Sequence, residues 1–170
     1  MTTFNVQVLF ENTRAVLSAF AEGRAPEEAT ETRYEQQHGA LYLALLRLET
    51  AEATQLADTI GDLCDSIHDV HEGLRPDAEL ASEIEARLGV ARELRQQIAE
   101  RHRRLEAADR AKHQRLKVNV RWQLDFADSL VGHLAAELNA LRTAELGLPK
   151  ASQELLALME RAVALLANQE

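Results

Sequence analysis

The sequence predicts an all-α fold, an antiparallel helical bundle of four to five helices with two long central helices. Helix-forming residues dominate the chain, apolar residues recur at spacings of three and four, and each of the three prolines follows closely after a glycine. Glycine tolerates the left-handed residue that ends a helix, and proline fits the first turn of the next helix. The pairs are Gly23 and Pro26, Gly73 and Pro76, and Gly147 and Pro149. They predict helices over residues 3–22, 26–72, 76–146 and 149–168.

The first and last segments carry clear amphipathic patterns. The apolar positions of the first are Val6, Leu9, Phe10, Thr13, Val16, Leu17 and Phe20, and those of the last are Leu155, Leu156, Met159, Val163 and Leu166. Their spacing places them on one side of a helix. We expect these two short helices to cover the ends of the two long ones.

The two middle segments are long for a globular protein of this size. At a rise of 1.5 Å per residue, 26–72 would extend about 70 Å and 76–146 about 105 Å. We therefore expect 76–146 either to bend or break around the polar run at 100–115, or to form a long antiparallel hairpin with 26–72. The short turn between the two segments favours antiparallel neighbours.

Length and composition predict a single helical-bundle domain over 1–170. No apolar run is long enough to cross a bilayer, and the N-terminus lacks a charged-then-apolar leader. The single cysteine, Cys64, excludes an internal disulfide, which favours a cytoplasmic location. We expect Cys64 to be a buried structural thiol.

The net charge of −9 is unevenly distributed along the chain. Residues 27–85 carry fifteen acidic residues against three arginines, whereas residues 100–121 carry eight basic residues against three acidic ones. The overall acidity argues against nonspecific nucleic-acid binding. The basic stretch is interpreted as a solvated helix face or a partner for the acidic helix. The alternative is a phosphate-binding patch that includes Arg104 and Lys112.

Acidic residues on segment 26–72 are the candidate metal ligands. In a continuous helix, Asp58, Asp62, Asp65, Asp69 and Glu72 share one face, opposite the apolar stripe, where a helix faces water. The same projection places Glu35, His38, Glu49 and Glu52 on or near the core-facing stripe, where an unpaired carboxylate is costly. The pairs Glu35-x-x-His38 and Glu49-x-x-Glu52 could then hold Mg²⁺ or Mn²⁺. The alternative is a kink near residues 50–54, which would rotate Glu49 and Glu52 out to solvent.

Residues 48–70, LETAEATQLADTIGDLCDSIHDV, resemble a segment of the all-α nucleotide pyrophosphatases, the MazG-like and dUTPase-like group. The resemblance implies that Glu49 and Glu52 form one ligand pair for Mg²⁺ and that Asp62 or Asp65 belongs to a second. Here the connection between the two acidic groups is shorter than in that family. Acids would hold the metal and the basic stretch would hold the phosphates.

Residues 113–146 form a helix that is apolar on two sides. One stripe comprises Val120, Leu124, Ala127, Val131, Leu134 and Leu138, and the other comprises Trp122, Phe126, Leu130 and His133. A helix of this kind is either central in a bundle or faces a second molecule. Trp122, Phe126 and Leu130 are therefore candidate interface residues, since large aromatic side chains often anchor protein interfaces.

These patterns predict a non-catalytic helical interaction or regulatory protein that acts through helix faces. It would bind a protein partner or form a homodimer, as a helical bundle or coiled coil. The alternative is a Mg²⁺- or Mn²⁺-dependent nucleotide pyrophosphatase-like hydrolase. In that alternative Glu49, Glu52, Asp62 and Asp65 are metal ligands, and Glu35 or His38 is a catalytic base or a further ligand. The sequence by itself supports no Ser–His–Asp or Cys–His nucleophile arrangement.

Overall fold

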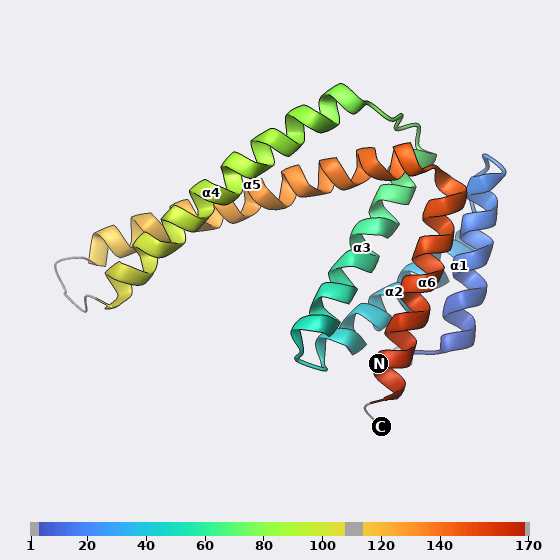
Figure 1. Cartoon of the computed structure of the whole chain (residues 1–170). Coiled ribbons are helices and arrows are strands. Elements are labelled where there is room, and N and C mark those ends of the chain that lie inside the picture. The colour runs from blue at the N-terminus through green and yellow to red at the C-terminus, as the bar shows by residue number, and fades with distance from the viewer. Residues whose placement is uncertain (1–3, 108–113, 169–170) are drawn as a thin grey trace. The chain divides into compact units, whose positions relative to one another are not determined.

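The computed structural model describes residues 4–107 and 114–168, and these residues contain six α-helices and no strand. The helices are α1 (Val6–Ala21), α2 (Glu28–Leu46), α3 (Ala51–His71), α4 (Ala78–Ala107), α5 (Gln114–Leu146) and α6 (Leu148–Ala167), as Figure 1 shows. The all-helical prediction is confirmed. None of the described helices is both long enough and apolar enough to cross a membrane.

The glycine stops lie where the sequence predicts them. Gly23, Gly73 and Gly147 have φ angles of 69°, 118° and 88°, and each lies just past the end of a helix. After α1, the backbone N–H of Arg24 donates to the Ala19 carbonyl at 3.0 Å, which satisfies an otherwise unpaired group at the helix end. Proline follows Gly147 in the first turn of α6.

A continuous helix over 26–72 is wrong, because the chain leaves the helix after Leu46 and starts a new one at Ala51. Glu49 has a φ of 53°, the left-handed region, which a helix interior excludes. The Thr50 hydroxyl then accepts the Ala53 N–H at 3.2 Å and begins α3 as an N-cap. This break changes the helical phase, so a single projection cannot describe both α2 and α3.

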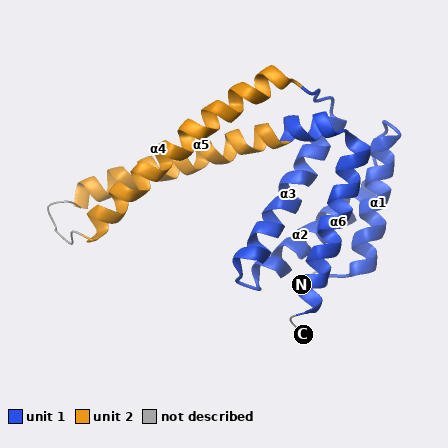
Figure 2. Ribbon diagram, in the orientation of Figure 1, with its two compact units in different colours: residues 1–76, 140–170 blue, residues 77–139 orange. Residues whose placement is uncertain are grey.

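The described chain divides into two compact units, shown in Figure 2. Unit 1 comprises residues 1–76 and 140–170, and unit 2 comprises residues 77–139. Unit 1 is therefore built from two separate stretches of sequence. The single domain over 1–170 stays a prediction.

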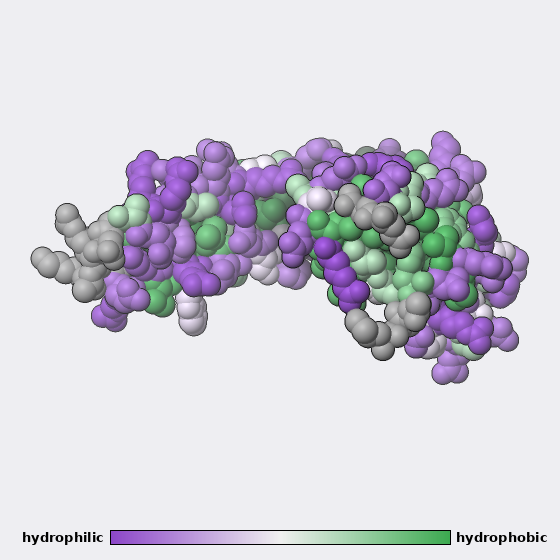
Figure 3. Space-filling model, turned by 90° about the horizontal axis from the view of Figure 1, so that it is seen from below, coloured by the Kyte–Doolittle hydropathy of each residue, from purple (hydrophilic) through white to green (hydrophobic). Residues whose placement is uncertain are grey.

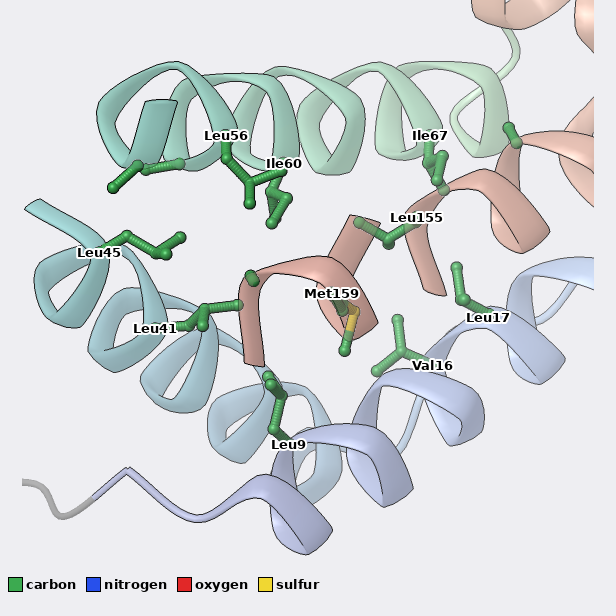
Figure 4. Close-up of a cluster of buried hydrophobic side chains, with 14 of the residues drawn as sticks. Leu9, Val16, Leu17, Leu41, Leu45, Leu56, Ile60, Ile67, Leu155 and Met159 are labelled. Carbon is green, nitrogen blue, oxygen red and sulfur yellow. The ribbon is translucent and has the colours of Figure 1, made fainter. Parts of the chain in front are cut away.

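Unit 1 is a four-helix arrangement around one apolar core. Each helix packs against its neighbours in the order α1, α2, α3, α6, with α6 also contacting α1. Figure 4 shows side chains from all four helices converging, among them Leu9, Leu45 and Met159, none of which is exposed to solvent. Burial of these aliphatic side chains is the main stabilising contribution.

Unit 2 is a helical hairpin formed by α4 and the first part of α5. An ion pair between Arg95 on α4 and Asp128 on α5 links the two helices. Among its described residues only four large hydrophobic side chains are buried: Ile84, Leu88, Val120 and Leu138. The segment 76–146, predicted as one region, contains two helices in the structure: α4 ends at Ala107 and α5 begins at Gln114.

Candidate functional site

An apolar groove runs between α4 and α5 within unit 2. Its volume is about 520 Å³. It is lined by Ala91, Leu94, Gln97, Ile98 and Arg101 of α4 and by Trp122, Gln123, Phe126, Ala127 and Leu130 of α5. Trp122 and Phe126 are 75% and 73% exposed. In Figure 3, hydrophobic side chains interrupt the hydrophilic surface along the part of the molecule formed by these two helices.

The groove follows from the two apolar sides of α5. Val120, Ala127 and Leu138 lie on the side that is buried in the structure. Trp122, Phe126 and Leu130 lie on the other side, and all three are exposed. A two-helix hairpin can bury only one stripe of each helix, so the second stripe remains open to solvent. Self-association through these residues stays a prediction.

Of the two predicted phosphate-binding residues, the structure describes Arg104. Arg104 Nε lies 3.0 Å from Glu100 Oε1, and Arg103 pairs with the same carboxylate. The hydrogen bond from Arg104 is the main reason that the pKa of Glu100 is lowered. Lys112 lies outside the described residues.

The four predicted metal ligands are all exposed, and they lie on different parts of the fold. Glu49 is in the break between α2 and α3, Glu52 is in the first turn of α3, and Asp62 and Asp65 lie farther along α3. Glu49 and Glu52 do not face the core: as the alternative of a kink expected, the helix is interrupted beside them, at residues 47–50, and both side chains are exposed. Across residues 4–107 and 114–168, no three His, Cys, Asp or Glu side chains are grouped so as to hold a metal ion.

The structure does assemble one polar cluster in unit 1, around His38. The His38 Nε2 lies 2.8 Å from the Thr13 hydroxyl, which itself lies 2.7 Å from the Leu9 carbonyl. A carbonyl oxygen only accepts, so the hydroxyl donates to Leu9 and accepts from Nε2–H. This leaves Nδ1 of the neutral imidazole without a proton, and the Cys64 thiol donates to it at 3.6 Å.

All ionisable members of this cluster are neutral near pH 7. Burial lowers the pKa of His38 to about 4 and raises the pKa of the Cys64 thiol to about 11. Burial, followed by the neighbouring Cys64, raises the pKa of the Tyr34 hydroxyl far above its usual range. The rings of Tyr34 and His38 lie 4.4 Å apart. A charged thiolate–imidazolium pair is therefore disfavoured, because both charges would be desolvated.

This Cys–His contact was not predicted from the sequence. His38 and Cys64 are 26 positions apart and lie on two helices that sequence reasoning joined into one. On one continuous helix they would be about 39 Å apart, at 1.5 Å per residue. Recognising Thr50 as an N-cap would have separated α2 from α3 and allowed them to pack side by side.

Comparison of the chain with protein-family models, with curated proteins and with solved structures finds no match. The resemblance of residues 48–70 to the all-α nucleotide pyrophosphatases therefore stays a prediction.

Proposed function

We propose that the protein is a helical interaction protein that pairs with a second copy of itself through the groove of the α4–α5 hairpin. The observation that carries this proposal is the exposure of Trp122 and Phe126 in an apolar groove. An aromatic side chain of this size buries about 150–250 Å² when it is covered. Covering such anchors is a common source of interface affinity.

The amount of exposed apolar side chain supports an interface. Unit 2 exposes eight large hydrophobic side chains: Leu80, Val90, Leu94, Leu116, Val118, Trp122, Phe126 and Leu130. A stable interface buries about 800 Å² on each partner. Two aromatic and several aliphatic side chains on one hairpin are enough to supply much of that area.

The charge distribution favours a second copy in antiparallel orientation. The Arg95–Asp128 ion pair lies level with the groove and divides the hairpin into two parts. The inner part contains the residues whose chain ends continue into unit 1, and the outer part contains the residues between Arg95 and Asp128 in the sequence. The outer part, residues 96–107 and 114–127, carries six basic and three acidic residues. The inner part, residues 77–94 and 129–139, carries two basic and six acidic residues. The described residues of the two parts therefore have net charges of +3 and −4.

A two-fold axis through the groove would place the outer part of each copy against the inner part of the other. Opposite charges then face each other, and the exposed aromatics meet at the centre. A parallel arrangement would place like charges together along the whole hairpin. Charge complementarity of this kind selects orientation and partner more than it adds affinity.

Sedimentation equilibrium of the full chain tests the pairing. We expect a concentration-dependent dimer that Trp122→Asp shifts to monomer, while Leu43→Asp leaves it intact. Leu43 is the matched control, because it is also an exposed apolar residue but lies on α2 in unit 1. A chain that stays monomeric at all concentrations would contradict the proposal.

A spin label distinguishes the two orientations. Position 118 is ten residues from Asp128, so two labels on Val118→Cys in a Cys64→Ser background would be separated by about 30 Å along the axis of an antiparallel dimer. In a parallel dimer they would be adjacent. A short distance measured by double electron–electron resonance would exclude the antiparallel arrangement while keeping the dimer.

A further inference from the structure

A second cavity, independent of the hairpin, lies between α2 and α3 in unit 1. It has a volume of about 310 Å³, within the range of small-molecule sites. Four buried aliphatic side chains, Leu41, Leu45, Ala57 and Ile60, form its apolar floor. Figure 4 shows Leu41 and Leu45 of α2 and Ile60 of α3 as part of the core cluster.

Two helical glycines border this cavity and keep space open. Gly39 on α2 and Gly61 on α3 both line it, and a Cβ built on either meets no atom within 4 Å. A glycine inside a helix costs about 1 kcal/mol relative to alanine. Side chains larger than hydrogen at these two positions would project into free space, so the glycines leave room for a ligand.

The polar side of the cavity provides no positive charge. Tyr34, His38 and Cys64 line it, and their hydrogen bonds to one another and to Thr13 satisfy the imidazole and the thiol within the protein. No lysine or arginine is among the residues that line the cavity. An anionic ligand would therefore find no partner there.

Carboxylates stand on both sides of the cavity instead. Glu35 on α2 and Asp65 on α3 line it, and both add to the forces that raise the pKa of Tyr34. Neither takes part in an ion pair among the residues that the structure describes. Asp62, which precedes Asp65 by three residues on α3, has a raised pKa because of burial first and then its neighbours Asp58 and Asp65. A cation at the cavity would relieve this repulsion.

We propose that the α2–α3 cavity binds a small organic cation, a substituted ammonium ion with an apolar body. The apolar body would cover the aliphatic floor, and the charged group would lie toward Glu35 and Asp65. Tyr34 and Tyr42 add aromatic surface, which attracts quaternary ammonium groups. A hydrated inorganic cation gains nothing from the aliphatic floor, so the cavity favours the organic ion.

Isothermal titration calorimetry with benzyltrimethylammonium tests the proposal. We expect saturable binding that weakens about tenfold in Asp65→Asn and again in Glu35→Gln, and that weakens as salt is raised. Asp69→Asn is the matched control, because Asp69 is an exposed acid on the same helix that does not line the cavity. We expect this control to bind like the wild type.

Two further measurements separate the charge from the cavity. Neopentylbenzene, the uncharged isostere, and phenylacetate, an anion, should bind at least tenfold more weakly than the cation. Gly61→Leu should abolish binding while the protein stays folded by circular dichroism, because the new side chain fills the cavity. The proposal would be overturned if the neutral isostere bound as tightly as the cation, or if Asp69→Asn weakened binding as much as Asp65→Asn. It would also be overturned if Gly61→Leu bound the cation normally, or if the wild type bound no cation at millimolar concentration.

Discussion

The two units of this molecule place their apolar residues and their charges in opposite ways. Unit 1 carries seventeen acidic and eight basic residues, so it holds the entire net charge of −9, and its apolar side chains meet in one closed core. Unit 2 carries eleven acidic and eleven basic residues. Of the large hydrophobic side chains that are exposed in the described residues, unit 2 holds eight and unit 1 holds four.

The difference follows from the number of helices in each unit. Four helices can enclose their apolar stripes on every side, whereas two helices leave one side of the hairpin open. Unit 1 can therefore tolerate acidic surfaces and still be held together by burial. Unit 2 has balanced charges and an open apolar face, and the proposed pairing rests on that apolar face.

The largest expected effect compares a core residue of unit 1 with an exposed aromatic residue of unit 2. Leu155→Ala should lower the free energy of unfolding by about 3 kcal/mol, since Leu155 is fully buried and its truncation leaves a cavity. Trp122→Ala should change it by less than about 0.5 kcal/mol at protein concentrations too low for association. Urea unfolding followed by circular dichroism measures both. A large loss in Trp122→Ala under these conditions would mean that the groove stabilises the monomer itself.

The next effect concerns pH, and it belongs to unit 1 alone. The pKa of His38 is about 4 in the folded chain and about 6.5 as its ordinary value, so the unfolded state binds more protons between these values. The contribution of neutral His38 to the free energy of unfolding is complete above pH 6.5 and is lost as the pH falls toward 4. The loss amounts to about 3 kcal/mol.

Variants of two histidines check the source of this pH dependence. The His38→Gln variant should lose the His38 part of the dependence in urea titrations between pH 7 and 4, because it has no imidazole to protonate. His133→Gln should keep it, since His133 is an exposed histidine of unit 2. If His38→Gln and the wild type show the same slope, His38 is not buried as described.

A smaller effect tests the N-cap that separates α2 from α3. Thr50→Ala should cost about 1 kcal/mol of stability, because the Ala53 N–H loses its acceptor. Thr54→Ala, an exposed position inside α3, should be close to neutral. Thermal unfolding of the two variants side by side measures the difference. Equal melting temperatures would show that the Thr50 hydroxyl does not cap the helix.

The smallest expected effect is a stabilisation at the same break. Glu49→Gly should raise the free energy of unfolding by about 0.5–1 kcal/mol, because glycine adopts the left-handed conformation with no steric penalty. Glu52→Gly should instead lower it by about 1 kcal/mol, since residue 52 is inside α3. Urea unfolding of both variants shows whether each substitution raises or lowers the free energy of unfolding. If Glu49→Gly destabilises the chain, the left-handed turn is incorrect.

The sequence predicted the helical class and the three glycine stops, because these depend on local properties of glycine and on the apolar period. It offered the break only as an alternative, a kink near residues 50–54, and the structure places it at 47–50. That break uses Glu49, a residue that rarely adopts a positive φ, and Thr50, whose capping role is one of several that threonine can have. The apolar stripe of α3 was projected back across this break, which is why Glu49 was expected near the core, whereas Glu52, Asp62 and Asp65 lie on α3 itself. Trp122 and Phe126 are far from it in the sequence, and their exposure agrees with the apolar period of α5 alone.

The division of unit 1 into two stretches of chain has a consequence for the order of events during synthesis. Ala151, Leu155, Met159 and Ala162 of α6 are completely buried in the core of unit 1, yet they are translated after the entire hairpin. The first three helices therefore leave the ribosome with an open apolar face. At 5–20 residues per second, they wait roughly 4–18 seconds for α6. During this interval the nascent chain is a natural substrate for a chaperone that shields exposed apolar surface.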